Sequence, residues 1–178
     1  MTKKETIKDG LVEEFYDNGQ LMRKNNYKDG ELDGLQEYFY ENGQLKRGNI
    51  KNGKEDGLWE LFHENGQLEE KTYYKDGKEV SRTSFFYYDN GQFWWSDNFK
   101  NGKLHGLREM FHYNGQLENR GNWKDGKRFG LWESFYDNGQ LRSRGNYKNG
   151  NKDGIWKRYD YDGNLTKTEE YKDGDLVE

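Results

Sequence analysis

The stretch Gly-Leu-Trp-Glu-Ser-Phe-Tyr-Asp-Asn-Gly-Gln-Leu at residues 130–141 ends in a turn signature that recurs along the chain. Asn-Gly-Gln-Leu or a close variant begins at seven positions, with successive spacings of 24, 23, 25, 24, 24 and 24 residues. A constant period of this length predicts an array of repeats, each a small supersecondary unit. The signatures begin at Asn18, Asn42, Asn65, Asn90, Asn114, Asn138 and Asp162.

A second turn signal, Lys-Asp-Gly or Lys-Asn-Gly, lies between successive signatures. Asn-Gly and Asp-Gly favour type I′ turns, whose two central residues both need a positive φ. Each period therefore contains two strands, and we expect two-residue turns, including one at Asn-Gly-Gln-Leu. The chain has no Pro, as suits strands that donate ladder hydrogen bonds. The central residues of the second turn begin at Asp29, Asn52, Asp76, Asn101, Asp125, Asn149 and Asp173.

These signals predict an all-β protein. We expect an elongated, single-layer, twisted antiparallel sheet of about 13–14 strands, in which each hairpin packs only on its neighbours. The seven repeats of about 24 residues form one array over residues 1–178, with hairpins centred near positions 18, 42, 65, 90, 114, 138 and 162. No helix period is present to supply a second layer.

A two-residue turn at Asn-Gly also predicts the register of each hairpin. It places opposite charges across from each other, which is what directly opposed strand positions favour. The same rule pairs Trp132 with Gly145, so that the ring would lie over a strand glycine. The second repeat is one residue short, and its pair Glu37–Arg47 requires a local slip. The regular charge pairs are Glu13–Lys24, Glu60–Lys71, Glu109–Arg120 and Glu133–Arg144.

That register sorts the side chains onto two faces. One face is expected to carry tyrosines such as Tyr16, leucines such as Leu21, and the tryptophans Trp59, Trp132 and Trp156. The other is expected to carry the glutamates flanked by leucines and phenylalanines. The leucines placed with the tyrosines are Leu21, Leu45, Leu68, Leu117 and Leu141, and the phenylalanines of the second face are Phe15, Phe39, Phe62, Phe111 and Phe135.

Composition narrows the class of protein. Charged residues make up 35% of the chain and mean hydropathy is −1.43, but aromatic residues reach 17%, so any core is aromatic. Net charge is −4 with both signs interspersed, which argues against a nucleic-acid partner. There is no Cys for a disulfide or thiolate metal site, and no apolar run long enough for a membrane span.

Residues 1–6 lack the apolar stretch of a signal peptide. This favours a cytoplasmic location for the chain as it stands, and secretion or surface exposure if a leader has been removed. The localisation therefore stays open.

The repeats at residues 57–68 and 130–141, with Gly-Asn-Tyr-Lys-Asn-Gly at residues 145–150, resemble the bacterial variant of the MORN repeat. The resemblance covers residues 10–174. Proteins of this kind are often labelled YwqK-like antitoxins, so the resemblance implies a hairpin sheet, a role in protein or membrane association and, from the label, a toxin partner. It implies no catalytic residues. A second resemblance, to aromatic repeats of surface choline- and glucan-binding proteins, rests on residues 87–95 alone.

The fourth repeat departs from the others. It has one extra residue between Gly77 and Asn90, which we expect to form a β-bulge, and the usual Gly-Leu is replaced near Arg82 and Thr83. Its charge pair becomes Phe85–Ser96. We expect Phe85, Tyr87 and Trp94 on the face that is charged elsewhere, and Phe86, Tyr88, Phe93, Trp95 and Phe99 on the opposite face.

Eight aromatic residues within residues 85–99 are too many for one hairpin to bury in a single-layer sheet. They could fill a bend or a homodimer contact, or form a recognition patch. The candidate binding patch is Phe85, Phe86, Tyr87, Tyr88, Phe93, Trp94 and Trp95.

No residue set points to catalysis. His63, His105 and His112 are expected to lie too far apart in an extended sheet to share a metal. His63 and His112 stand where other repeats have Tyr, and are interpreted as variants of a structural ring. The glutamate row at residues 13, 37, 60, 109 and 133 is interpreted as structural, since four members face a predicted basic partner. We therefore expect no catalytic residues, no metal and no cofactor.

The function favoured by the sequence is a non-enzymatic repeat scaffold for protein–protein interaction, with antitoxin-like action as its most specific form. The partner would be a protein, either a toxin or an envelope protein, and not a nucleic acid. A membrane surface has no support in the sequence, and self-association through an open sheet edge stays open. The alternative is a surface-associated aromatic module that binds glycan or a cell-envelope ligand.

Overall fold

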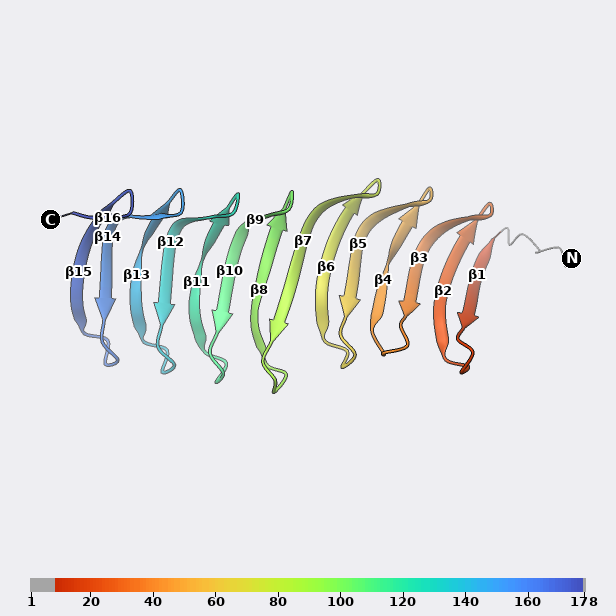
Figure 1. Ribbon diagram of the computed structural model, residues 1–178, viewed down its shortest axis with the longest axis horizontal. Helices are drawn as coiled ribbons and strands as arrows, with labels where there is room; N and C mark the ends of the chain where they lie inside the picture. Colours follow the sequence, from red (N-terminus) through yellow and green to blue (C-terminus); the bar gives the residue numbers. More distant parts are fainter. Residues whose placement is uncertain (1–8, 178) are drawn as a thin grey trace, which may run out of the picture. The chain divides into compact units, whose positions relative to one another are not determined.

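A computed structural model describes residues 9–177, which form β-strands and turns. All strand pairs are antiparallel, and the strand order in the sheet follows the chain, except that β9 pairs only with β8 (Figure 1). The predicted all-β class is confirmed as one antiparallel, open, 16-stranded sheet of hairpins. The strands are β1 (Gly10–Phe15), β2 (Leu21–Lys28), β3 (Glu31–Phe39), β4 (Leu45–Lys51), β5 (Lys54–Phe62), β6 (Leu68–Lys75), β7 (Lys78–Tyr87), β8 (Phe93–Lys100), β9 (Lys103–Leu104), β10 (Gly106–Phe111), β11 (Leu117–Lys124), β12 (Lys127–Phe135), β13 (Leu141–Lys148), β14 (Asn151–Tyr159), β15 (Leu165–Lys172) and β16 (Asp175–Leu176).

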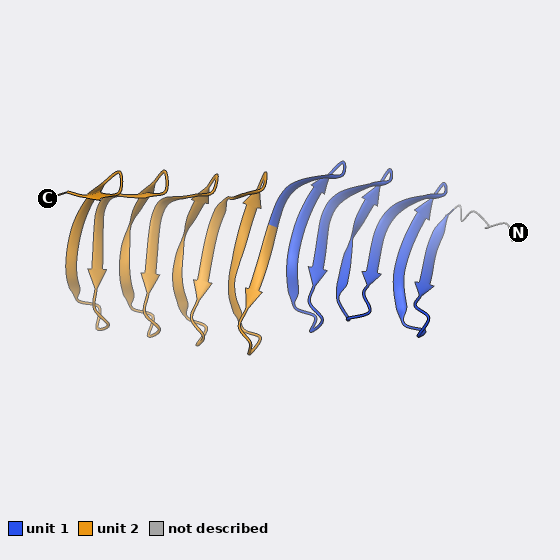
Figure 2. Cartoon of the chain, viewed as in Figure 1, with its two compact units in different colours: residues 1–82 blue, residues 83–178 orange. Residues whose placement is uncertain are grey.

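Contacts divide the chain into two compact units, unit 1 at residues 1–82 and unit 2 at residues 83–178 (Figure 2). Within each unit, the two classes of turn lie along opposite margins of the strands. No helix in residues 9–177 combines the length and apolar character needed to cross a bilayer. The single array over residues 1–178 stays a prediction, and the residues behind the signal-peptide argument lie outside those described.

The two turn classes have different backbones. In the Lys-Asp-Gly class, Asp125 (φ 51°) and Gly126 (φ 81°) are both left-handed, so the predicted type I′ turn is confirmed. In the Asn-Gly-Gln class only the Gly is left-handed, as at Gly139 (φ 83°), and the two-residue turn predicted there is wrong. The Asn138 side chain accepts the Gln140 amide hydrogen bond at 2.9 Å, an Asx turn that competes with the type I′ geometry.

The Asn-Gly-Gln turn is closed by Tyr136 and Gln140, whereas a two-residue turn would be closed by Asp137 and Gln140. The Tyr136 amide donates to the Gln140 carbonyl at 2.8 Å, and the Gly139 amide donates to the Tyr136 carbonyl at 2.9 Å. The next pair is Phe135 with Leu141, followed by Ser134 with Ser143, so Arg142 is an extra, bulged residue. The bulge returns the strands to the register that a two-residue turn would have produced.

The predicted register is therefore confirmed although the predicted turn is not. The second repeat lacks the bulged residue, and its strands pair without a shift from Phe39–Leu45 to Gly34–Ile50. Its predicted slip is explained by that missing residue. The confirmed pairs are Glu13–Lys24, Glu60–Lys71, Glu109–Arg120, Glu133–Arg144 and Glu37–Arg47.

The turn geometry changes the assignment of the leucines. Phe15 is directly opposite Leu21, and directly opposed residues lie on the same face of a sheet. The prediction that Leu21, Leu45, Leu68, Leu117 and Leu141 share the face of the tyrosines is wrong, because one residue in the loop moves a side chain to the other face. We call the face with the Phe15, Leu21 and Glu13 rows the charged face, and the face with Trp59, Trp132 and Trp156 the tryptophan face.

Ion pairs cross the strands of the charged face within and between hairpins. Lys24 contacts Glu13 at 3.2 Å within its hairpin. Glu60 lies between Arg47 of the preceding hairpin at 2.8 Å and Lys71 of its own at 3.8 Å. A strand inside a sheet has two neighbouring strands, so each charged side chain can form an ion pair with a residue on either of them. Exposed pairs of this kind contribute roughly 0.2–1 kcal/mol each.

The tryptophan face carries the buried core. Trp59, Trp132 and Trp156 are 4%, 7% and 6% exposed, and each ring lies on a glycine of the preceding strand. A Cβ atom on Gly121 would lie 2.1 Å from the Trp132 ring. The glycines under the rings are Gly48, Gly121 and Gly145, and each indole N–H donates at 3.1 Å to the following carbonyl, that of Asn49, Asn122 or Asn146.

This corrects one expectation about Trp132. It pairs with Gly145 as predicted, but its ring leans the other way, onto Gly121 of β11. Gly145 is covered by Trp156 instead. The preceding strand has a glycine, which has no Cβ atom to obstruct the ring, and a carbonyl group that accepts the indole hydrogen bond.

A second link joins successive repeats near the Asn-Gly-Gln turns. The hydroxyls of Tyr16 and Tyr88 donate to carbonyls 23 residues further on, those of Phe39 and Phe111, each at 2.8 Å. Nε2 of His112 lies 2.9 Å from the equivalent carbonyl of Phe135, so this imidazole takes the place of a tyrosine hydroxyl. The link recurs in these repeats because each presents the equivalent carbonyl 23 residues further along the chain.

We expect Gly121→Ala to lower the free energy of unfolding by about 1–3 kcal/mol, because the new methyl group meets the Trp132 ring. In a Trp132→Ala background the same change should cost less than about 1 kcal/mol, since the obstruction is gone. Urea denaturation of the four proteins measures this coupling. Equal costs in both backgrounds would contradict the packing described.

The two turns should also respond differently to a β-branched residue. Asn149→Val should cost about 1–2 kcal/mol, because position 149 is left-handed (φ 53°). Glu41→Val, at an exposed position of an Asn-Gly-Gln turn, should change stability by less than about 0.5 kcal/mol. Thermal unfolding of both variants tests this, and a larger loss for Glu41→Val would refute the turn assignment.

Candidate binding site

The candidate site lies on the hairpin of β7 and β8. β7 has ten residues where β5 and β12 have nine, which accommodates the extra residue of this repeat. It also lacks the left-handed glycine that bends the other strands, such as Gly57 (φ 86°) or Gly130 (φ 69°). That the extra residue forms a bulge, and that Phe85 pairs with Ser96, stay predictions.

The turn of this hairpin has the same geometry as the others. The Tyr88 amide donates to the Gln92 carbonyl at 2.9 Å, and the Gly91 amide donates to the Tyr88 carbonyl at 2.8 Å. Trp94 therefore corresponds to the bulged residue Arg142 of the β12–β13 hairpin. Trp95 pairs with Met110 of β10.

Phe85, Tyr87 and Phe93 form an aromatic cluster on the charged face. The ring of Phe93 lies 6.4 Å from Phe85, 6.0 Å from Tyr87 and 5.6 Å from Phe111 of β10, centroid to centroid. These separations are within the range at which aromatic pairs attract each other. Because Phe85 occupies the position of the glutamates, the row of charges is interrupted here.

Phe86, Tyr88, Trp94 and Trp95 form a second cluster on the tryptophan face. Phe86 stacks on Trp95 with centroids 4.3 Å apart, and Tyr88 stacks on Trp94 at 4.9 Å. The two indoles meet edge to face at 4.0 Å. Tyr113 of the next turn extends the cluster, 5.1 Å from Tyr88.

The seven residues of the candidate patch lie on two faces, as expected, but two of them are on the other face from the one predicted. The assignment of Trp94 to the face of Phe85 and Tyr87 is wrong, and so is that of Phe93 to the face of Phe86 and Tyr88. The cause is again the turn, whose bulge exchanges the two positions after Gln92. Whether either cluster binds a partner is a separate question from where the rings lie.

Both clusters present uncharged aromatic surface. Phe86 is 37% and Tyr113 60% exposed, and the other rings are half-buried. Burial raises the pKa of the Tyr87 hydroxyl. Burial, and to a smaller extent the nearby Glu118 carboxylate, raises the pKa of the Tyr88 hydroxyl, so both groups stay neutral at physiological pH. Neutral rings that remain partly exposed are typical of protein contact surfaces.

A charged pair that sequence reasoning missed lies beside Trp95. Nε of Arg108 is 3.1 Å from Oδ1 of Asp97, with side chains only 22% and 16% exposed, and the Arg108 guanidinium lies 5.8 Å from the Trp95 ring centroid. Trp95 Nε1 is 3.4 Å from the other carboxylate oxygen of Asp97. Arg108 and Asp97 occupy the positions that Trp132 and Gly121 occupy elsewhere. The replacement of a Trp–Gly pair by two residues of opposite charge was the signal available in the sequence.

The histidines take part in separate local contacts. His63 Nδ1 lies 3.3 Å from Glu69, and His105 Nδ1 lies 3.8 Å from Asp125. His112 bonds to a backbone carbonyl, as described above. Within residues 9–177, no group of three or more His, Cys, Asp or Glu side chains is placed to hold a metal ion.

Comparison with known families reproduces the division seen in the repeats. The family model described as MORN repeat variant matches residues 8–29, 32–52, 55–76, 104–125, 130–149 and 152–173. These matches cover the hairpins β1–β2, β3–β4, β5–β6, β10–β11, β12–β13 and β14–β15. The β7–β8 hairpin, which carries the two aromatic clusters, lies outside them.

Solved structures add only weak likenesses. The crystal structure of TarM is 15% identical over 62% of this chain and 20% of that chain, with a TM-score of 0.34. The crystal structure of the GtfA/B complex is 15% identical over 74% of this chain and 20% of that chain, with a TM-score of 0.28. This chain thus spans a fifth of their length, and the scores are too low to support an argument. No curated protein matches the chain.

The Arg108–Asp97 pair should behave as a substitute for the Trp–Gly pair. Arg108→Ala should destabilise the protein by about 1–3 kcal/mol, because Asp97 would remain half-buried without its cation. The double change Asp97→Gly and Arg108→Trp should return stability to within about 1 kcal/mol of wild type. Urea denaturation measures both. A double variant no more stable than Arg108→Ala would refute the equivalence.

Proposed function

The chain belongs to the MORN repeat variant family, and we propose that it is a non-enzymatic repeat scaffold that binds another protein. The observation that carries the proposal is the concentration of neutral aromatic side chains on β7–β8. Six hairpins obey the family pattern and supply a frame, whereas the remaining hairpin of the described sheet carries the exceptional residues. Repeat proteins commonly combine a regular frame with local binding features.

The chemistry of the clusters favours a protein partner. Tyr, Trp and Phe are enriched in protein interfaces, where a ring gives a large contact area at a small loss of side-chain entropy. The Phe85 cluster interrupts a charged row that continues with Arg120 and Glu133 on β11 and β12, so apolar and charged surfaces follow each other on this face, as in an interface with a polar rim. The Trp94 cluster has Arg108 beside it for a similar role.

The most specific form of the proposal is an antitoxin-like role, in which the partner is a toxin. It rests on the label often given to proteins with this type of repeat. A partner in the cell envelope is the other form. Absence of catalysis is part of the proposal, and it is supported by the local contacts that hold each histidine.

A glycan ligand is the second candidate, favoured by one observation. The exposed Phe86 ring stacked on Trp95 offers a flat aromatic surface of the kind on which a sugar ring packs. Sugar-dependent quenching of tryptophan fluorescence would favour this candidate over a protein partner.

The test treats the two clusters separately because they lie on opposite faces. In one variant, Phe85→Glu with Ser96→Arg, the fourth repeat regains the charges of its neighbours and the charged-face cluster is disrupted. In the other, Trp94→Ala, the stack with Tyr88 is removed. Phe129→Ser, which removes a 49% exposed ring on β12, is the matched control.

Wild type and variants are used to capture partners from source cells, and the identified partner is then titrated against each protein by calorimetry. We expect one cluster variant to weaken the affinity by roughly tenfold or more, as loss of an interface anchor does. Phe129→Ser should bind like wild type. If both cluster variants remain folded and bind the partner unchanged, the β7–β8 hairpin is not the interface.

A further inference from the structure

Basic side chains gather on the tryptophan face of unit 2, away from the aromatic hairpin. The Arg128 guanidinium lies 4.7 Å from the Trp132 ring centroid, and the Lys152 ammonium lies 4.6 Å from that of Trp156. Arg142, the bulged residue of β13, lies 5.8 Å from the Tyr136 ring. Cations over aromatic rings are held in place without the need for a carboxylate.

None of these three cations forms an ion pair with another described residue. Arg128 donates to the Tyr147 hydroxyl at 2.9 Å, and Lys152 lies 3.5 Å from the Tyr171 hydroxyl. In the part of the chain that the structure describes, none of the three is within ion-pair distance of a carboxylate. On the charged face of the same unit, Arg120 is 2.7 Å from Glu133.

The cations surround two connected hollows. One, of about 480 Å³, is lined by Arg142, Lys152 and Arg158 with the hydroxyl groups of Ser143 and Thr166, and no carboxylate lines it. The other, of about 220 Å³, contains Arg128. Ser134, Ser143 and Trp156 line both, so the hollows adjoin each other on β12, β13 and β14.

Two charged side chains on the rim of these hollows already have partners of opposite charge. Arg158 lies 3.2 Å from Glu169, and Glu133 of the smaller hollow lies 2.7 Å from Arg120. The cations left to compensate an outside charge are therefore Arg128, Arg142 and Lys152. The chain as a whole has a net charge of −4, so this concentration of positive charge is local.

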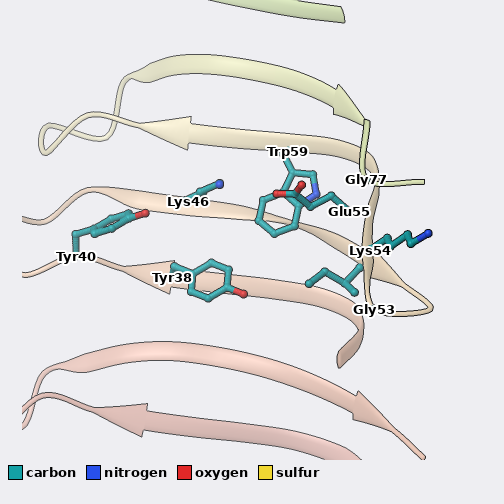
Figure 3. A pocket seen from close by; sticks show the side chains of 9 residues that line it. Tyr38, Tyr40, Lys46, Gly53, Lys54, Glu55, Trp59 and Gly77 are labelled. Atoms are coloured by element: carbon teal, nitrogen blue, oxygen red, sulfur yellow. The ribbon is translucent and has the colours of Figure 1, made fainter. Parts of the chain in front are cut away.

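Unit 1 contains an equivalent hollow with a different charge. It has a volume of about 520 Å³ and is built around Trp59, with the Lys46 ammonium 4.9 Å from the ring (Figure 3). Glu55 lines it at the position, four residues before the tryptophan, that Lys152 occupies in unit 2. The same architecture therefore accepts either sign of charge at this position, and the fold does not require a cation there.

We propose that the hollow of unit 2 is a binding site for an extended acidic polypeptide segment. Arg128 and Lys152 occupy equivalent positions 24 residues apart, which places them two strands or about 9.6 Å apart. Three residues of polyproline II span about 9.3 Å and return a side chain to the same side. A segment with a carboxylate at every third residue thus matches the two cations.

The spacing of the cations also favours this ligand over anions whose negative charges lie closer together. Rings and hydroxyl groups, among them Tyr147 and Ser143, line the smaller hollow beside Arg128, and they suit the backbone and uncharged side chains of a peptide. A polyphosphate chain or an anionic lipid surface would bring more negative charges than Arg128, Arg142 and Lys152 can compensate. The site is separate from the β7–β8 hairpin, so this inference does not depend on the proposed function.

The test uses two charge reversals on the same strand. Lys152→Glu removes a cation of the hollow and reproduces Glu55 of unit 1, so we expect the fold to be retained. Lys157→Glu is the matched control, because Lys157 lines a hollow on the charged face with Leu131 and Ile155. Both variants change the net charge equally, and Arg128→Glu serves as an independent second variant.

The probe is a proline-rich peptide with glutamate at every third residue, titrated by fluorescence anisotropy at low salt. Lys152→Glu and Arg128→Glu should each weaken binding by roughly tenfold, and Lys157→Glu by less than about twofold. A peptide of the same composition with its glutamates in one block should bind more weakly. Circular dichroism confirms that each variant is folded.

Three results would overturn the inference. Equal weakening by Lys157→Glu would show that only net charge matters. Tighter binding of inorganic polyphosphate or phosphatidylglycerol vesicles than of the peptide would assign the hollow to another anion. Absence of peptide binding to the folded wild-type protein would remove the site altogether.

Discussion

A single-layer sheet has no second layer against which to bury side chains, so burial has to occur between neighbouring strands. This chain achieves it by laying an indole ring flat on the preceding strand, which is possible only where that strand has no Cβ atom. The indole N–H then reaches a backbone carbonyl, so the ring is buried without an unsatisfied donor. Trp132 on Gly121 shows the arrangement, and its repetition holds successive hairpins together.

The same constraint explains the polar residues that other repeats carry at the glycine and tryptophan positions. Where the glycine is replaced by Asn25, the tryptophan is replaced by Gln36, and both are almost fully buried. The Gln36 side-chain amide donates to the Asn26 carbonyl at 3.1 Å, as an indole would. In β15 the position holds Glu169, whose carboxyl pKa is lowered by a hydrogen bond from Lys167 and by the charge of Arg158. Polar residues at these positions thus have polar partners in place of the Trp–Gly contact.

The two surfaces of unit 2 with unusual chemistry arise from departures at different points of this pattern. On β7–β8 the charge pair is absent, β7 lacks the left-handed glycine of the other strands, and aromatic side chains lie on both faces. On β12–β14 the Trp–Gly pairs are intact, and the departure is in the cations above the rings, Arg128 and Lys152. The regular frame lets such departures change the surface while the antiparallel strand order is kept. This separation of frame and surface is consistent with a scaffold of the MORN repeat variant family.

The sequence by itself determined the repeat, the alternation of two turns, the all-β class and the pairing of Glu13 with Lys24 and its equivalents, because these follow from local backbone preference and a strict period. It also singled out the fourth repeat, because counting residues needs no coordinates. The faces of Phe93 and Trp94 could not be predicted in this way. The two faces depend on whether the Asn90 side chain accepts a hydrogen bond from the Gln92 amide and so replaces the two-residue turn. A loop that differs by one residue moves each side chain between the turn and the bulge to the opposite face of the sheet.

Only the tertiary structure decided which neighbour each ring and each charge selects. Trp132 has a glycine on both adjacent strands, and the strand carrying Gly121 is chosen because a carbonyl lies there to accept the indole hydrogen bond. Arg120 likewise has a glutamate on either side and contacts Glu133. A residue inside a sheet always has two candidate partners at similar distance. The choice between them is made by packing in three dimensions, which the linear order of residues does not record.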